Sequence, residues 1–163
     1  ILLLDEPTSG VDPVTRQGFW QLLIRLLRQG VAVLLSTPYM DEASRCGRVG
    51  FLHHGRLLTE GRPSDLTGAM QDRVLEVSGA DRRAVEGAAR GNPAVEGAQA
   101  FGEHGHVYVR PGSAGEAAEW LTQELSRRGI RSVDVRVVPA SLEDVFIDLL
   151  RDRDGGSAQG GMR

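Results

Sequence analysis

Two uninterrupted apolar runs near the start of the chain constrain its fold more than any other feature. Residues 1–4 (ILLL) form the first run, which Asp5, Glu6 and Pro7 end, and residues 31–35 (VAVLL) form the second. Short, wholly apolar runs are typical of strands buried on both faces of a sheet. The segment between them has a helical pattern, so we expect a βαβ crossover and a parallel sheet.

The helical segment carries start and stop signals. Asp12 can cap the helix, Pro13 suits its first position, and Gly30 is placed to end it. Apolar residues recur between these points at the spacing of one helix face: Phe19, Leu22, Leu23, Leu26 and Leu27. Beyond the second apolar run the sequence predicts a helix over 39–46, a hairpin from 49–52 and 56–60, and a helix over 64–70.

The composition changes at about residue 73, where Gly, Ala and Arg become more frequent and the apolar runs shorter. The predicted elements are a strand at 73–78, a helix at 81–90, strands near 95–101 and 105–110, a helix at 114–128, a strand at 132–138 and a helix at 141–151. This βαββαβ order with a final helix predicts a small α+β appendage over 73–152. The Gly-rich tail, residues 153–163, is expected to be disordered.

Composition excludes several classes of protein. A net charge of −3 gives no electrostatic reason to expect a nucleic-acid partner, and a single Cys, Cys46, excludes an internal disulfide framework. No apolar run approaches the roughly 20 residues of a transmembrane helix. All 19 basic residues are Arg, so the chain has no Lys with which to build a P-loop of the form G-x-x-x-x-G-K-[ST]. Because Ile1 already lies inside an apolar run, we expect the natural chain to begin upstream.

The adjacent carboxylates of Asp5 and Glu6 are the candidate site. Open α/β sheets bind ligands beyond the carboxyl ends of their strands, where this pair is expected to lie. Neighbouring strand residues point to opposite faces, so one carboxylate can face a metal held by nucleotide phosphates while the other faces an attacking water. The alternative is that Asp5 and Glu6 merely end a strand and cap the segment that follows.

Four segments together resemble the ATP-binding subunits of ABC transporters. Residues 1–13 (ILLLDEPTSGVDP) resemble the Walker B motif and D-loop, and residues 36–43 (STPYMDEA) resemble the H-loop, or switch, region. Residues 55–61 (GRLLTEG) resemble the strand pair that follows in this family. Residues 141–146 (SLEDVF) resemble the ending of subunits from drug and antibiotic exporters.

The resemblance implies a fold class and an organisation. Residues 1–72 would be the C-terminal part of a P-loop NTPase parallel-sheet domain, beginning at Walker B, followed by the α+β appendage. Such subunits pair to sandwich two ATP molecules and drive a membrane permease, so the implied partners are permease subunits and a second ATP-binding domain. The implied place is the cytoplasmic face of the cell membrane, and the implied cofactors are ATP and Mg²⁺. Without Walker A and signature motifs, this chain alone is expected not to hydrolyse ATP.

The resemblance also implies residue roles. Asp5 would assist Mg²⁺, directly or through water, and Glu6 would be the catalytic base. Ser9 to Asp12 would cross the interface between the two ATP-binding domains and couple their nucleotide sites. Pro38 stands at the switch position, where most family members carry a His that contacts the terminal phosphate.

Pro38 is a departure from the family pattern. Proline has neither a side-chain donor nor a backbone N–H, so it cannot replace the hydrogen bond of that His. The sequence therefore predicts a slow or degenerate site on this half, paired with a competent site on a second unit. A simpler interpretation is that Pro38 only starts the next helix. Two other functions stay open: a non-hydrolysing nucleotide-binding module, and a soluble ABC ATPase acting on ribosomes or DNA.

Overall fold

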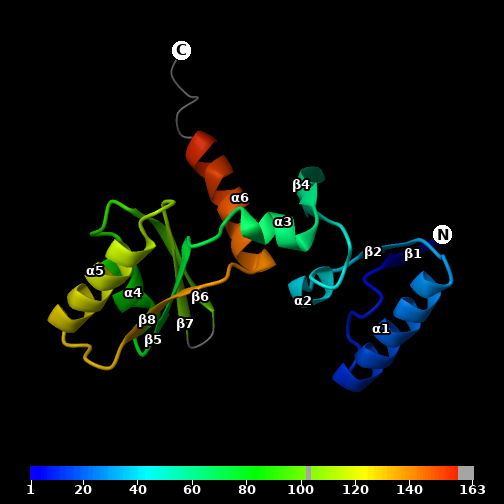
Figure 1. Cartoon of the computed structure of the whole chain (residues 1–163), viewed down its shortest axis with the longest axis horizontal. Helices are drawn as coiled ribbons and strands as arrows, with labels where there is room; N and C mark the ends of the chain where they lie inside the picture. The colour runs from blue at the N-terminus through cyan, green and yellow to red at the C-terminus, as the bar shows by residue number, and fades with distance from the viewer. Residues whose placement is uncertain (102–103, 158–163) are drawn as a thin grey trace, which may run out of the picture. The chain divides into compact units, whose positions relative to one another are not determined.

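The computed structural model describes residues 1–101 and 104–157 (Figure 1). The chain divides into two compact units, Ile1–Val49 and Gly50–Arg163. This division falls earlier than the change of character expected at 72/73. One reason is that Phe51 packs on Phe146, with their ring centroids 5.4 Å apart, so the hairpin region belongs with the C-terminal half. The assignment of residues 1–72 to an ATP-binding domain stays a prediction.

The first unit is built around a βαβ crossover. Strand β1 (Leu2–Asp5) and strand β2 (Val33–Ser36) pair in parallel, joined by helix α1 (Pro13–Arg28). A short helix, α2 (Met40–Ala43), follows. The register places Asp5 opposite Ser36, so the carboxyl ends of the two strands coincide. The predicted crossover is therefore confirmed.

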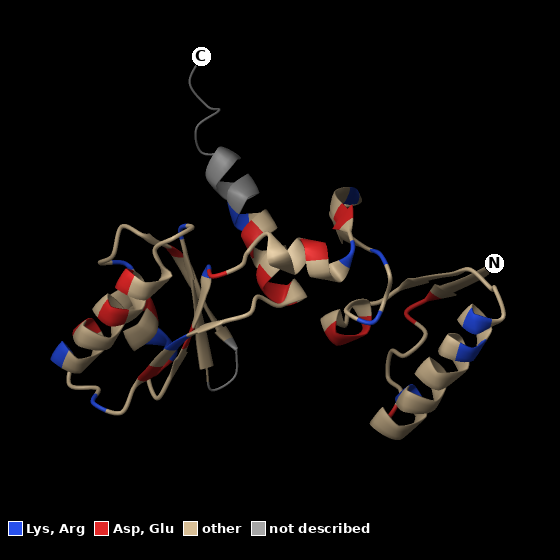
Figure 2. Cartoon of the chain, in the orientation of Figure 1, with Lys and Arg blue, Asp and Glu red and all other residues tan. Residues whose placement is uncertain are grey.

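Helix α1 begins and ends where its sequence signals indicate. Asp12 is the N-cap, and its carboxylate accepts hydrogen bonds from the N–H groups of Val14 and Thr15 at 3.0 and 3.1 Å. Gly30 follows the helix with a φ of +84°, a conformation that glycine adopts without the steric cost of a Cβ. The charged residues of α1 are all Arg, whereas α5 and α6 of the second unit carry both signs (Figure 2).

Within the residues that the structure describes, alternate side chains of the strands of the first unit are exposed. Leu3 is 70% exposed and Leu34 is 68% exposed, while their neighbours Leu2 and Val33 are half-buried. Successive strand side chains point to opposite faces, so one face of the β1–β2 pair is open. An apolar run alone does not distinguish a strand covered on both faces from one covered on a single face.

The second unit begins with a hairpin and a short helix. Strand β3 (Val49–His53) pairs with strand β4 (Arg56–Gly61), and helix α3 (Pro63–Gly68) follows. The turn residues His54 and Gly55 have φ values of 46° and 73°. Two left-handed residues in a two-residue turn match the twist of the flanking strands, which is why such turns close hairpins.

A four-stranded antiparallel sheet forms the rest of this unit. Its elements are β5 (Val74–Ser78), α4 (Arg82–Ala89), β6 (Val95–Phe101), β7 (His104–Val109), α5 (Ala114–Arg127) and β8 (Asp134–Val138). The spatial order is β6-β7-β5-β8, and each neighbouring pair is antiparallel. Each of these strands and helices lies within a few residues of its predicted position.

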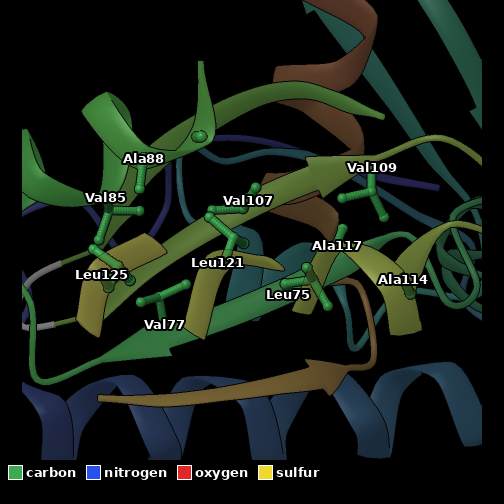
Figure 3. Close-up of a cluster of buried hydrophobic side chains, with 11 residues drawn as sticks. Leu75, Val77, Val85, Ala88, Val107, Val109, Ala114, Ala117, Leu121 and Leu125 are labelled. Carbon is green, nitrogen blue, oxygen red and sulfur yellow. The ribbon is translucent and has the colours of Figure 1, made fainter. Parts of the chain in front are cut away.

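One face of this sheet is covered by α4 and α5, and the hydrophobic core lies there. Figure 3 shows side chains from these helices meeting those of β5 and β7. The buried cluster consists of Leu75, Val77, Val85, Ala88, Ala89, Val107, Val109, Ala114, Ala117, Leu121 and Leu125. Burial of this much aliphatic surface is the main source of stability for the unit.

Helix α6 (Leu142–Ser157) contacts the other face of the sheet, and a buried carboxylate makes part of that contact. Asp144 is fully buried, and its Oδ1 accepts hydrogen bonds from Tyr108 Oη at 2.9 Å and from His106 Nδ1 at 2.8 Å. Its Oδ2 accepts hydrogen bonds from the backbone N–H and the hydroxyl of Ser141 at 2.8 and 2.7 Å. Four hydrogen bonds from β7 and the helix start therefore satisfy a charge that has no access to water.

Helix α6 is longer than predicted. It continues to Ser157, so residues 153–157 are helical rather than part of a disordered tail. No proline interrupts this stretch, and Gly155 and Gly156 lower helix propensity without forbidding a helix. The remainder of the predicted tail, residues 158–163, lies outside the described residues. Within the described ranges, no helix combines the length and the apolar character needed to cross a membrane.

Candidate functional site

The two candidate carboxylates lie at the carboxyl end of β1, beside the end of β2. The hydroxyl of Ser36 donates a short hydrogen bond to Oδ1 of Asp5. The backbone N–H of Glu6 points to Ser36 as well, 3.1 Å from its carbonyl oxygen and 3.0 Å from its Oγ. Asp5 and Glu6 are both exposed, as a pair that meets a ligand in solution must be. The expected position of this pair, beyond the strand ends, is the one observed.

The backbone at Glu6 departs from the strand into an uncommon conformation. Its φ is 43°, in the left-handed region that costs residues with a Cβ of the order of 1–3 kcal/mol. The turn is held by hydrogen bonds from Ser9 N–H to the Glu6 carbonyl and from Val11 N–H to the Thr8 carbonyl, both 3.1 Å long. Strain of this kind is often kept at functional sites, where it fixes the direction of a side chain.

The other predicted site residues lie on the segments that leave the two strands. Ser9 is exposed within the turn, and Asp12 is exposed at the start of α1. The carboxylate of Asp12 is engaged in the cap, and hydrogen bonds from Thr15 and Val14 hold the pKa of this carboxyl below its usual value. Asp12 thus ties the end of this turn to the start of α1.

Pro38 is exposed and precedes α2 without belonging to it. Tyr39 is the N-cap and the helix begins at Met40, so Pro38 lies outside the first turn. Pro38 therefore directly precedes the N-cap of the helix without occupying its first position, and its part at the switch position stays a prediction. Thr37, on the other side of Pro38, accepts a hydrogen bond at its Oγ1 from the Tyr39 N–H at 3.1 Å.

Sequence reasoning missed the buried carboxylate behind this site. Glu42 lies within the helix predicted over 39–46, and its exposed fraction is 0%. Its Oε2 accepts hydrogen bonds from Thr8 Oγ1 at 2.9 Å and from Thr37 Oγ1 at 2.7 Å. Its Oε1 accepts one from Trp20 Nε1 at 3.3 Å and lies 3.8 Å from Arg16 Nε.

Glu42 remains ionised in this environment. Burial alone would raise the pKa of Glu42, but hydrogen bonds from Thr37, Thr8 and Trp20 outweigh it and hold the pKa below its usual value, with the charge of Arg16 adding to the effect. The carboxylate is therefore an acceptor for all of its donors at neutral pH.

The residues at this site suit a Mg²⁺ ion that takes most of its ligands from water and a bound nucleotide. Among residues 1–101 and 104–157, no three His, Cys, Asp or Glu side chains gather as ligands for a metal. Asp5 offers a hard oxygen donor, and Mg²⁺ commonly takes one or two protein carboxylates together with waters and substrate phosphates. A single carboxylate at the strand end suits that ion when a nucleotide supplies the remaining ligands.

Comparison with known proteins gives relatives of one kind. No family model matches the chain. One relative is the probable multidrug ABC transporter ATP-binding protein YbhF of Escherichia coli K12. The two are 50% identical over 66 residues, which are 40% of this chain and 11% of that protein. Another relative is the Nod factor export ATP-binding protein I of Cupriavidus pinatubonensis. The two are 35% identical over 151 residues, which are 91% of this chain and 43% of that protein.

A similar match links the chain to a protein from another genus. The Nod factor export ATP-binding protein I of Rhizobium etli is 34% identical over 151 residues, which is 91% of the chain and 45% of that protein. The chain thus spans less than half the length of these curated relatives. Over that part, the chain matches ATP-binding proteins of ABC transporters, relatives whose names describe Nod factor export and probable multidrug transport.

Proposed function

We propose that this chain is part of an ATP-hydrolysing subunit that powers an ABC exporter. The observation that carries the proposal is the placement of Asp5 and Glu6 at the carboxyl end of β1, directly beside Ser36 at the end of β2. The segment with Thr37 and Pro38 leaves the same edge of the sheet, so the Walker B and switch regions begin side by side. ATP is the nucleotide that the names of the relatives specify.

In this proposal the two carboxylates have separate tasks. Asp5, oriented by the Ser36 hydroxyl, binds Mg²⁺ directly or through water. The ion neutralises phosphate charge when it is bound with ATP. Glu6, turned out of the strand by its left-handed backbone, orients a water and takes its proton. Ser9 and Asp12, on the exposed turn, contact the partner ATP-binding domain at a shared nucleotide site.

Pro38 favours a second candidate, a nucleotide-binding module that hydrolyses slowly or not at all. Its ring presents no donor to a terminal phosphate, and its exposed position leaves the switch segment without that contact. In an asymmetric pair, this half would bind ATP and a competent site elsewhere would turn it over. The two candidates differ in the rate of phosphate release and agree on binding.

The wider assignment rests on the relatives. Their names describe Nod factor export and probable multidrug transport, so export of a cargo through a permease is the proposed context. A second ATP-binding domain and the permease subunits are the proposed partners, and they would hold the protein at the cytoplasmic face of the membrane. The chain has no Lys, so a phosphate-binding loop must come from another segment or another chain.

The test uses the intact protein that contains this chain. We expect Glu6→Gln to lower ATP turnover by about 10²–10⁴-fold, the contribution of a positioned general base, while nucleotide binding is retained. Glu119→Gln is the matched control, because it makes the same substitution at an exposed position of α5. Wild-type turnover in Glu6→Gln would refute the role of Glu6. Tight ATP binding without phosphate release by the wild type would select the non-hydrolysing candidate.

A further inference from the structure

Three segments of the first unit converge on the two carboxylate oxygens of Glu42. Thr8 lies two residues after Glu6, and Thr37 stands next to Pro38; both hydroxyls donate to Oε2. Helix α1 supplies Trp20 to Oε1 and places Arg16 nearby. The turn after β1, the segment after β2 and α1 are therefore joined at one side chain.

The arrangement is buried, not a surface contact. Glu42 is 0% exposed, Thr8 is 1% exposed and Trp20 is 6% exposed. Taking a carboxylate out of water is strongly unfavourable unless charge-assisted hydrogen bonds replace its hydration. The short helix α2, only 4 residues long, has little stability of its own. The hydrogen bonds to Glu42 thus fix α2 and the segments it contacts in one relative position.

Thr37 extends this network across Pro38. Its Oγ1 accepts the N–H of Tyr39 and donates to Glu42, so the peptide groups on both sides of the proline are linked to the buried carboxylate. The ring of Tyr39 lies under the guanidinium of Arg16, with 4.6 Å between the Arg16 Cζ and the ring centroid. The switch segment is held from behind by these contacts, although its own proline offers no donor.

We propose that Glu42 is a positioning residue for the hydrolytic site, setting the turn that carries Glu6 against the switch segment. The inference rests on the proposed function. Thr8 is the contact on the Glu6 side and Thr37 is the contact on the switch side, and both use the same oxygen atom. A displacement at either threonine moves one half of the site relative to the other.

Substitutions can separate the charge of Glu42 from the individual hydrogen bonds that it accepts. Glu42→Gln keeps the side-chain volume but removes the charge, and its amide nitrogen must face either the two threonine hydroxyls or the donors of Trp20 and Arg16. Thr8→Val removes one hydrogen bond while keeping the shape, and Thr8→Ser restores the hydroxyl. The same pair of substitutions applies at Thr37.

The experiment measures ATP turnover and nucleotide affinity separately in the intact protein. Because a misplacement of about 1 Å can cost about 10²-fold in rate, we expect Glu42→Gln and Thr8→Val to lower kcat by about 10- to 100-fold. KM and nucleotide affinity should change by less than about three-fold, since the phosphate-binding groups are untouched. Thr8→Ser and Thr37→Ser should recover most of the rate. Combining Thr8→Val with Glu42→Gln should cost little more than Glu42→Gln alone, because both act through one contact.

Asp144→Asn is the matched control, because it removes the charge of an equally buried carboxylate in the second unit. It should lower stability and leave kcat unchanged. Wild-type kcat in Glu42→Gln and in both valine variants would overturn the positioning role while leaving the proposed function intact. Equal loss of rate in the serine and valine variants would also overturn it, because the hydroxyl would then not matter. A wild type that releases no phosphate would overturn the proposed function and this role together.

Discussion

Replacing Asp144 with alanine should weaken the second unit more than any single exposed substitution. The side chain is fully buried and accepts four hydrogen bonds, from Tyr108, His106 and twice from Ser141. Removing one partner of a buried charged pair typically costs about 3–5 kcal/mol, because the remaining donors are left without acceptors. We expect Asp144→Ala to lower the free energy of unfolding of this unit by about that amount. Asp144→Asn, which keeps an acceptor, should cost about 1–3 kcal/mol.

The same contact predicts how stability changes with pH. The hydrogen bond to Asp144 raises the pKa of His106 above its ordinary 6.5, against the opposing effect of burial, and Glu76 on β5 adds to the rise with an Oε2 atom 3.9 Å from Nε2. A group whose pKa is raised on folding contributes stability that is complete below its unfolded pKa and is lost as pH rises through its folded pKa. Wild-type stability should therefore fall as pH rises above about 6.5, and Asp144→Ala should flatten this dependence.

At acid pH the stability contributed by Asp144 changes in the opposite direction, because it is lost as pH falls. Burial opposes the shift, but the hydrogen bonds from His106 and Ser141 hold the pKa of Asp144 below its ordinary 3.8. Its contribution is present above pH 3.8 and is lost as pH falls through the lower, folded pKa. Changes measured between about pH 6 and 8 therefore do not report on protonation of Asp144, and the part of them that Asp144→Ala removes is assigned to His106.

Urea unfolding followed by fluorescence can measure these effects in one unit at a time. Trp120 packs against the core of the second unit, whereas Trp20 belongs to the first. With Trp20→Phe as the common background, Trp120 reports unfolding of the second unit alone. An Asp144→Ala variant within about 1 kcal/mol of its parent would refute the reasoning, since typical buried-pair losses are several times larger. A pH dependence identical to that of the parent would refute the assignment to His106.

Two further predictions concern the candidate site and the core. Pro38→His in the intact protein should raise ATP turnover by about 10²–10³-fold, because it restores one donor to the transferring phosphate, and no gain in phosphate release would contradict the assigned role of Pro38. Leu121→Ala should lower the free energy of unfolding of the second unit by about 2–5 kcal/mol in the same urea assay, because Leu121 is fully buried between α5 and the sheet. Leu57→Ala, at a side chain 51% exposed, is its control and should change stability by less than about 0.5 kcal/mol.

Local signals were enough to predict most elements of the fold. The crossover followed from two apolar runs with Asp12 and Gly30 at the ends of the helix between them, and these residues act there as predicted. The position of Asp5 at the edge of the sheet followed from the parallel pairing alone. Such features depend on neighbouring residues, for which propensity, capping and periodicity are direct physical constraints.

Features that depend on distant contacts were not predicted. Glu42 is buried by residues as many as 34 positions away, and nothing local distinguishes it from an exposed glutamate in a first helical turn. The division of the chain after Val49 reflects the packing of Phe51 on Phe146, which are remote in sequence.

The two fully buried carboxylates differ in the chemistry of their partners, and this separates the responses of the two units to pH. Glu42 is bound by Thr8, Thr37 and Trp20, with Arg16 nearby, and none of these side chains changes protonation between about pH 6 and 8. Asp144 is bound by His106, which does. The part of a stability loss with rising pH that Asp144→Ala removes therefore originates in the contact of α6 with His106. The hydrogen bonds to Glu42 are therefore expected to stay constant over that range.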